Sequence, residues 1–194
     1  MARKTLVIDL DRCIGCKSCE VACKQENEVV LGSAWNKVIT RGPTGTYPDI
    51  EMYYFPAVCQ QCENPECVKV CPTGASYKQK DGIVLVDREK CIGCGYCLMA
   101  CPYGVRTFNK EKKVAEKCTL CDHLQAVGEK PACVKICPAG ARLFGDLDDS
   151  ESDASVAIKE AGSENVHSLP DVGNKPTVRY ILHSTTAKWR EGKK

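Results

Sequence analysis

The sequence contains few of the aromatic residues from which ordinary hydrophobic cores are built. Its 194 residues include three phenylalanines and two tryptophans. Large aromatic side chains carry much of the buried area in most domains. A core made from so few of them would be thin, so part of the interior must be filled by something other than side chains.

Long apolar runs are absent as well. No stretch approaches the roughly 18 apolar residues that indicate a membrane-spanning helix. Asp9 interrupts the apolar segment near the start, which therefore resembles neither a secretory nor a twin-arginine signal. We expect a soluble chain, either cytoplasmic or held at the cytoplasmic membrane by partner proteins, with the side of the membrane left open.

Catalytic patterns and a strong net charge are missing too. No Ser/His/Asp arrangement, phosphate-binding loop or pair of carboxylates stands out from the background. The formal net charge of +2 leaves out the charge of bound groups, and the groups inferred below would make the loaded chain negative, which argues against nucleic-acid binding. We therefore expect a chain that is no enzyme by itself and has no nucleic-acid partner.

Cysteine is the residue that the sequence has in excess, with sixteen copies. They fall into four motifs, one of which has the C-x2-C-x2-C-x3-C-P spacing of bacterial ferredoxins. The motifs are Cys13-x2-Cys16-x2-Cys19-x3-Cys23, Cys59-x2-Cys62-x4-Cys67-x3-Cys71-Pro72, Cys91-x2-Cys94-x2-Cys97-x3-Cys101-Pro102 and Cys118-x2-Cys121-x11-Cys133-x3-Cys137-Pro138. This spacing predicts [4Fe–4S] clusters, four in all, that replace part of the missing core.

Zinc and disulfides are the alternatives that the cysteines leave open. Thiolates are soft ligands that bind zinc as well as iron–sulfur clusters. Zinc sites, however, combine two separated pairs of ligands and often include histidine, whereas each motif here has four cysteines and three motifs end in proline.

An oxidised cluster with four thiolates carries about −2, so four of them would bring the loaded chain to roughly −6.

The motifs must pair with one another, but their spacing does not say how. In two-cluster ferredoxins the fourth cysteine of one motif ligates the cluster of the other. The intervals between the second and third motifs and between the third and fourth are similar in length. Counting residues therefore leaves more than one pairing open.

The segments between the motifs predict short strands, hairpins and helices. We expect strands over 4–10 and 177–182, a helix that continues from residue 24 to about Glu28, and a polar helix over 153–161. Three hairpins are expected, over 35–55 with its turn at 41–45, over 77–88 with its turn at Asp81-Gly82, and over 107–117. The aromatic stretch 53–55 is expected to pack on a cluster-bearing loop, and the tail 188–194 to be a solvated basic end.

From Lys4 to about Asp148 the chain resembles the four-cluster iron–sulfur subunit of the dimethyl sulfoxide reductase family of molybdo- and tungstoenzymes. Polysulfide, thiosulfate, tetrathionate and arsenate reductases belong to this group. The residues that carry the resemblance are Asp11-Arg12-Cys13-Ile14-Gly15-Cys16, the x4 interval before Cys67, Cys71-Pro72-Thr73-Gly74-Ala75, the insertion before Cys133, and Arg142-Leu143-Phe144-Gly145-Asp146-Leu147.

The resemblance implies a particular pairing, the first motif with the fourth and the second with the third. The implied ligand sets are Cys13, Cys16, Cys19 and Cys137; Cys118, Cys121, Cys133 and Cys23; Cys59, Cys62, Cys67 and Cys101; and Cys91, Cys94, Cys97 and Cys71. Some relatives have tryptophan at the position of Cys94 and hold a three-iron cluster there. Cys94 is present here, so four cubane clusters are expected.

The expected fold is α+β, with two pseudo-symmetric ferredoxin-like modules, one nested within the other. The outer module comprises 1–34 and 112–148, the inner one with its preceding hairpin 35–111, and a C-terminal extension 149–194. The implied function is single-electron relay between a molybdenum or tungsten bis-pterin catalytic subunit and a quinone-reactive membrane subunit or another redox donor. The alternatives are an iron–sulfur subunit of a hydrogenase or formate dehydrogenase, a free polyferredoxin, and a zinc-stabilised binding module.

Basic residues flank the motifs and have two interpretations. They either offset cluster charge or are ordinary solvated side chains, and we favour the second interpretation. These residues are Arg12, Lys17, Lys24, Lys69, Lys90, Lys117 and Lys135. We expect His123 to lie on the surface of the insertion loop, and the ring of Tyr96 to shield its cluster from water.

Overall fold

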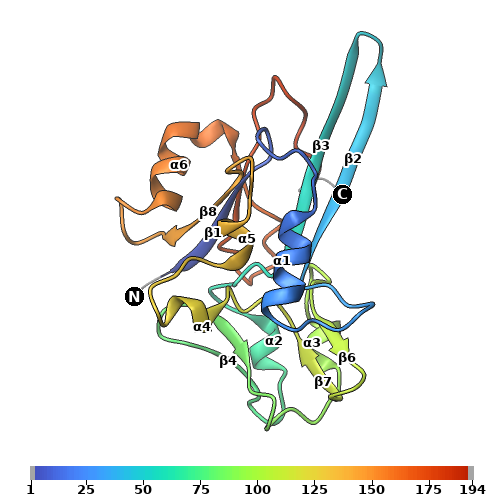
Figure 1. The fold of residues 1–194 in the computed structure, drawn as a ribbon, viewed down its shortest axis with the longest axis vertical. Helices are drawn as coiled ribbons and strands as arrows, with labels where there is room; N and C mark the ends of the chain where they lie inside the picture. Colours follow the sequence, from blue (N-terminus) through green and yellow to red (C-terminus); the bar gives the residue numbers. More distant parts are fainter. Residues whose placement is uncertain (1–2, 192–194) are drawn as a thin grey trace.

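The computed structural model describes residues 3–191, which form a mixture of short helices and strands (Figure 1). A four-stranded sheet has the order β8-β1-β10-β9, with β1 over Lys4–Asp9, β8 over Arg142–Asp146, β9 over Val166–His167 and β10 over Arg179–Ile181. Strands β1 and β10 run parallel, and the other neighbours are antiparallel. The sheet therefore joins the beginning of the chain to three strands from its C-terminal part.

Strand β1 is central because its residues are apolar on both faces. Leu6, Val7 and Ile8 are fully buried, as expected for a strand that is covered on both sides. On one face Val7 packs with Ala154 of helix α6 (Asp153–Ala161). On the other face Leu6 and Ile8 belong to the main core. The predicted strand and polar helix are both confirmed.

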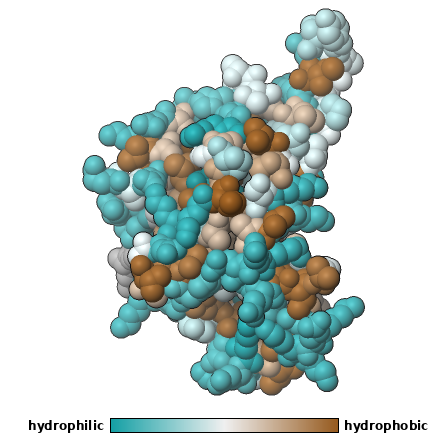
Figure 2. Space-filling view, in the orientation of Figure 1, coloured by the Kyte–Doolittle hydropathy of each residue, from teal (hydrophilic) through white to brown (hydrophobic). Residues whose placement is uncertain are grey.

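The hairpin of β2 (Asn36–Thr46) and β3 (Asp49–Val58) projects from the body as a long arm (Figures 1 and 2). The hairpin is confirmed, but its predicted turn at 41–45 is wrong. The strands shift register between Arg41 and Thr44, and the chain turns at 47–48 instead. Gly42 and Gly45 both have positive φ, so the glycines that suggested a turn form a bulge within a continuous strand.

The other two predicted hairpins are confirmed and are short. One pairs β4 (Ser76–Lys78) with β5 (Val84–Val86), and the other pairs β6 (Thr107–Asn109) with β7 (Val114–Glu116). The helices of the cysteine motifs are also short, apart from α1. They are α1 (Ser18–Glu26), α2 (Glu66–Lys69), α3 (Tyr96–Met99), α4 (Asp122–Gln125) and α5 (Ala132–Lys135), and a 3-10 turn η1 lies at Ser163–Asn165.

The main core joins the N-terminal strand, the β2–β3 hairpin and the C-terminal segment. It contains Leu6, Phe55, Leu120 and the fully buried Tyr180. Buried cysteines, including Cys23, belong to the same cluster of side chains. The interior therefore combines a small apolar core with the cysteine sites around it, as the shortage of aromatic residues predicts.

The C-terminal tail is not the solvated end that its composition predicts. Trp189 stacks on His167 with ring centroids 5.0 Å apart and lies 5.5 Å from the ring of Tyr180. The guanidinium of Arg190 is 3.1 Å from the carboxylate of Glu51 on the hairpin arm. The prediction is wrong for 188–191 because this one large aromatic residue anchors the segment, and 192–194 lie outside the described residues.

None of the helices within residues 3–191 is long and apolar enough to cross a bilayer.

Candidate metal centres

The structure brings the sixteen cysteines together around four cavities. The linings include Cys59, Cys62, Cys67 and Cys101 in the first cavity; Cys13, Cys16, Cys19 and Cys137 in the second; Cys71, Cys91, Cys94 and Cys97 in the third; and Cys23, Cys118, Cys121 and Cys133 in the fourth. We call these the Cys59, Cys13, Cys91 and Cys23 sets. They have the same members as the four sets that the family resemblance implies, and their role as ligands is taken up as a proposal below.

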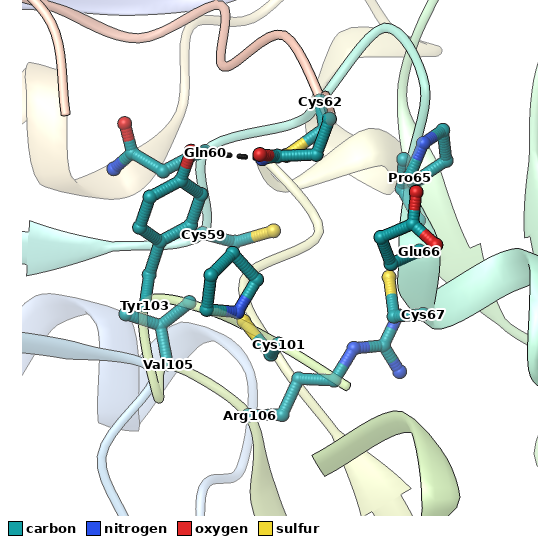
Figure 3. A pocket seen from close by; sticks show the side chains of 13 residues that line it. Cys59, Gln60, Cys62, Pro65, Glu66, Cys67, Cys101, Tyr103, Val105 and Arg106 are labelled. Atoms are coloured by element: carbon teal, nitrogen blue, oxygen red, sulfur yellow. Dashed lines mark hydrogen bonds between the residues drawn. The ribbon is translucent and has the colours of Figure 1, made fainter. Parts of the chain in front are cut away.

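The four cavities are alike in size and in kind. The space that each encloses is small, about 20 Å³ in the first three and about 10 Å³ in the fourth. The cysteines surround a space instead of meeting at a point, and among residues 3–191 no three His, Cys, Asp or Glu side chains converge as ligands of one ion. Figure 3 looks into the first cavity, where four cysteines surround the space and Arg106 lies at its edge. Four thiols that lie around a space and do not converge on one point suit a cluster better than a single ion.

Positive φ angles shape the loops that present the first cysteines of the motifs. Gly15, Gly93 and Gly95 are left-handed, with φ of 68°, 71° and 78°. A Cβ at Gly93 would lie 2.6 Å from the carbonyl oxygen of Lys113. Glycine is required there because only glycine adopts this conformation freely and allows such a close approach of backbones.

The aromatic stretch 53–55 contacts a cysteine loop, as predicted. A Cβ added at Gly15 would lie 2.5 Å from the ring of Tyr54, so the ring lies directly against the backbone of the first motif. Tyr54 also packs beside Cys19 and Cys133. The β2–β3 hairpin therefore covers the loop of the Cys13 set.

Backbone N–H groups donate to several of the sulfur atoms. The amide of Ser76 donates to Cys71 Sγ over 3.3 Å, that of Ala141 to Cys137 Sγ over 3.3 Å, and that of Leu120 to Cys118 Sγ over 3.4 Å. Hydrogen bonds to sulfur stabilise negative charge on it and are one means of setting the potential of a cluster.

Two buried arginines lie among the cysteine sets. Arg106 Nη2 donates to Cys67 Sγ over 2.9 Å and to the hydroxyl of Ser76, which lines the cavity of the Cys91 set. Burial opposes the charged form of Arg106, but the nearby Cys67, Cys59 and Cys97 outweigh it and raise its pKa. Arg142 lies between the Cys13 and Cys23 sets, where burial again opposes its charge and Cys133 and Cys19 raise its pKa well above the usual value.

One asparagine from the C-terminal segment also reaches a cysteine. Asn174 Nδ2 lies 3.0 Å from Cys62 Sγ, to which it donates, and 2.8 Å from the hydroxyl of Tyr103. At the Cys23 set, Asn27 Nδ2 lies at a longer 3.6 Å from Cys121 Sγ. The sequence interpretation missed Arg106, Arg142 and Asn174 as contacts of the cysteines.

A sequence signal for the arginines exists, whereas none exists for the asparagine. Both arginines end a repeated Cys-Pro-x-Gly-x-Arg segment, at 101–106 and 137–142. Asn174 lies 112 residues from the cysteine that it contacts, in a segment without any motif. Folding alone brings that side chain to its site.

The buried thiols fit a site that exchanges protons for iron. Burial raises the pKa of both Cys23 and Cys62 to about 12. Such thiols are protonated at neutral pH unless a metal takes the place of the proton, since the thiolate is the ligand. Four thiols per cavity, amide donors and buried cations together match the needs of an anionic iron–sulfur cluster.

The predicted flanking residues divide into two groups. Lys117 is almost completely buried, and its Nζ donates to the carbonyl oxygens of Val84 and Cys118, so a solvated role is wrong for this residue. Lys135 pairs with Glu129 at the surface. The exposed ring of His123 hydrogen-bonds Glu26 over 2.8 Å, which confirms its predicted surface position.

Comparison with known proteins agrees with the residues at these sites. Two family models match the chain, each described as a 4Fe-4S dicluster domain, over residues 50–147 and residues 12–75. The fold and the four cysteine sets thus define an iron–sulfur protein with two dicluster domains. Two such domains and sixteen cysteines correspond to four [4Fe–4S] clusters.

Three relatives identify the family more closely. A protein of Halobacterium salinarum described as a dimethyl sulfoxide reductase iron–sulfur subunit is 45% identical over 93% of this chain and 79% of its own. A sulfite dehydrogenase subunit of Allochromatium vinosum is 44% identical over 96% and 85%. The thiosulfate reductase electron transfer subunit of Salmonella typhi is 49% identical over 78% and 80%.

The chain belongs to the family of iron–sulfur subunits of the dimethyl sulfoxide reductase family enzymes. The three relatives are described as subunits of two reductases and a dehydrogenase, one of them as an electron transfer subunit, which is consistent with an electron-transfer role for this chain. The alternatives of a hydrogenase or formate dehydrogenase subunit and of a free polyferredoxin are not favoured.

Proposed function

We propose that the chain relays single electrons through four [4Fe–4S] clusters, one held by each of the Cys13, Cys23, Cys59 and Cys91 sets. The observation that carries this proposal is the grouping of all sixteen cysteines around four similar cavities. When bound, each cluster accepts and gives up one electron. The protein supplies the thiolates, the hydrogen bonds to sulfur and the buried positive charges.

Contacts between the sets support a linear order. Arg142 lines the cavities of both the Cys13 and the Cys23 set. Cys118 of the Cys23 set and Cys59 belong to one core cluster and are close enough to interact electrostatically. Arg106 donates to Cys67 of the Cys59 set and to Ser76, which lines the cavity of the Cys91 set. The proposed order is therefore Cys13, Cys23, Cys59 and Cys91.

Exposure supports the two ends of this order as the places where electrons enter and leave. Of the sixteen cysteines, only Cys16 and Cys94 are exposed, and they belong to the first and last sets. Apolar residues stand exposed beside each, with Ile14 and Val21 near Cys16 and Ile92 and Met99 near Cys94. Figure 2 shows several separate hydrophobic patches on one face of the molecule. Exposed apolar patches are common where partners dock.

We propose a catalytic subunit with a molybdenum or tungsten bis-pterin cofactor as the partner at one end. A quinone-reactive membrane subunit or another redox donor is the proposed partner at the other end. The names of the relatives support a catalytic partner, since they include a reductase and a dehydrogenase. The proposed relay works in either direction, because one-electron transfer between clusters is reversible.

The proposed architecture is the nested pair of ferredoxin-like modules, with 35–111 inserted between 1–34 and 112–148. Helix contacts support it, because α1 of the first motif packs against α5 of the fourth and α2 of the second packs against α3 of the third. The shared cysteines support it too, since Cys137 lines the cavity of Cys13 and Cys23 lines that of Cys118.

Cysteine replacement followed by EPR spectroscopy tests the proposed ligand sets. Cys137→Ser is expected to alter the cluster of the Cys13 set, and the matched Cys101→Ser that of the Cys59 set. Cys94→Ser is expected to convert the cluster of the Cys91 set to a three-iron form while the other three persist. If Cys137→Ser altered the Cys91 cluster instead, the nested pairing would be wrong. An anaerobic preparation with far fewer than about sixteen irons per chain would contradict the relay itself.

A further inference from the structure

We propose that Arg106 and Arg142 are positioning residues of the relay, each of which holds two neighbouring clusters at a raised reduction potential as a shared buried cation. This inference rests on the proposed ligand sets. It assigns Arg106 to the clusters of the Cys59 and Cys91 sets and Arg142 to those of the Cys13 and Cys23 sets.

Geometry places each guanidinium between two sets. Arg106 hydrogen-bonds Cys67 of the Cys59 set and also Ser76, which lines the cavity of the Cys91 set. Arg142 lines the cavities of both the Cys13 and the Cys23 set. Neither arginine has a carboxylate partner among the hydrogen bonds and ion pairs of residues 3–191. The negative charge that balances them must therefore come from the cysteine sites.

A neutral acceptor fixes the position of each arginine. Arg106 Nη2 donates to the hydroxyl of Ser76 over 2.7 Å, and Arg142 Nη2 donates to Asn36 Oδ1 over 2.7 Å. These acceptors are themselves buried. They orient the guanidinium but do not neutralise its charge. A carboxylate partner in a salt bridge would neutralise it. The arrangement thus preserves the positive charge for the cysteine sites.

Burial makes both charges effective. Arg106 is 6% exposed and Arg142 is 4% exposed, and charges in such surroundings interact more strongly than charges in water. One nitrogen of each guanidinium, Nη1, is buried and finds no acceptor within residues 3–191. An orphaned buried donor is unfavourable. A cluster in the adjacent cavity would supply the missing acceptor and the missing negative charge together.

The repeat explains why there are two such residues. Cys101-Pro102-Tyr103-Gly104-Val105-Arg106 and Cys137-Pro138-Ala139-Gly140-Ala141-Arg142 place an arginine five residues after the last cysteine of a motif. The corresponding position after Cys71 is Ser76, which is the acceptor for Arg106. Each pair of motifs thus has one arginine at this position. The same position in the other motif of the pair is Ser76 after Cys71 and Glu28 after Cys23.

Adding an electron to a cluster adds one negative charge, so a nearby cation favours the reduced form. Replacing Arg106 by glutamine is therefore expected to lower the potentials of both clusters of the Cys59–Cys91 pair. We expect at least a tenfold fall in the reduced-to-oxidised ratio at a fixed potential, about 59 mV for a one-electron couple. Arg142→Gln is expected to do the same to the Cys13–Cys23 pair only.

The test is an EPR-monitored redox titration of the full chain with its clusters bound, with signals assigned through the cysteine variants above. Arg106→Lys keeps the positive charge, so the potentials of both clusters are expected to stay close to those of the unaltered protein. Lys110→Gln is the matched control, because Lys110 is exposed at the turn of the β6–β7 hairpin. It removes a positive charge from the same module and is expected to leave all four potentials within experimental scatter.

The pattern of shifts decides the outcome. A shift in the potential of only one cluster, an equal shift in all four, or no shift would overturn the proposal. This holds even where the cysteine variants confirm the ligand sets. If both Arg106 variants lose iron, the count decides. Loss of about eight irons, two whole cubanes, supports a shared residue, and loss of about four contradicts it.

Discussion

The hydrogen bond from Asn174 to Cys62 allows one prediction to be worked through from its geometry. Asn174 Nδ2 donates to the sulfur over 3.0 Å, and Asn174 itself is buried. Replacement by leucine keeps a side chain of similar size and removes the donor. The hydrogen bond stabilises negative charge on the sulfur, and the reduced cluster of the Cys59 set is more negative than the oxidised one. Loss of the donor therefore destabilises the reduced cluster more than the oxidised cluster. The potential of this one cluster is therefore expected to fall.

The size of the shift follows from the strength of the bond. A hydrogen bond to a charged group contributes about 1.5–3 kcal/mol in net terms. If about half of this differs between the two oxidation states, the fall is roughly 30 to 65 mV, since about 1.4 kcal/mol corresponds to 59 mV for one electron. An EPR-monitored titration resolves a change of this size.

One further variant separates the effect of the hydrogen bond from a general loosening of the loop. Tyr103→Phe removes the hydroxyl that contacts both Asn174 and the carbonyl oxygen of Pro170, yet it leaves the contact with Cys62 in place. We expect it to shift the potential by less than a quarter as much. Equal shifts in Tyr103→Phe and Asn174→Leu would refute the reasoning, and so would no shift in Asn174→Leu.

Two other predictions concern the loops and the tail. Gly93→Ala brings a Cβ to 2.6 Å from the carbonyl oxygen of Lys113, whereas the equally left-handed Gly95 has open space around its Cβ position. Both replacements carry a backbone strain of about 1–3 kcal/mol, but only Gly93→Ala adds a steric clash. Only this variant is therefore expected to lose about four irons, as measured by iron content. Equal losses in the two variants would show that backbone strain, and not the clash, is responsible. Trp189→Ala is expected to destabilise the C-terminal segment by roughly 2 kcal/mol, because Trp189 packs on the ring of His167 but is only half buried. Faster hydrogen exchange over 183–191 measures this, and unchanged exchange would mean that the other tail contacts suffice.

Local sequence patterns predicted most of the secondary structure because their causes are local. The helix over Asp153–Ala161 begins after Ser152, whose hydroxyl accepts from the amide of Ser155, and a cap of this kind can be recognised in the sequence. The displaced turn of the first hairpin could not be predicted in this way. Glycines with positive φ serve a bulge as well as a turn, and the cross-strand register decides between them.

The sequence also did not predict which charged residues are buried. Lys117 follows a charged hairpin and looks like a surface residue, yet the fold surrounds it with carbonyl oxygens. Arg142 was noticed only as part of a family motif, although it is one of the most buried charged residues. Long-range packing determines such environments, because the acceptor of Arg142 lies 106 residues away, at Asn36.

The sequence by itself determined the kind of protein and the number of its clusters, because thiolate spacing within a motif is a local property that a short loop and one helical turn can realise. Cysteine spacing left the pairing of the motifs open; the family resemblance implied one pairing, and the tertiary structure groups the distant cysteines in the same way. Cys137 lines a cavity with Cys13, and Cys23 lines one with Cys118. The tertiary structure alone decided which two sets reach the surface and which cations are buried between them. Such contacts depend on how the core folds the chain back on itself, and residues far apart in the sequence carry no spacing from which they could be read.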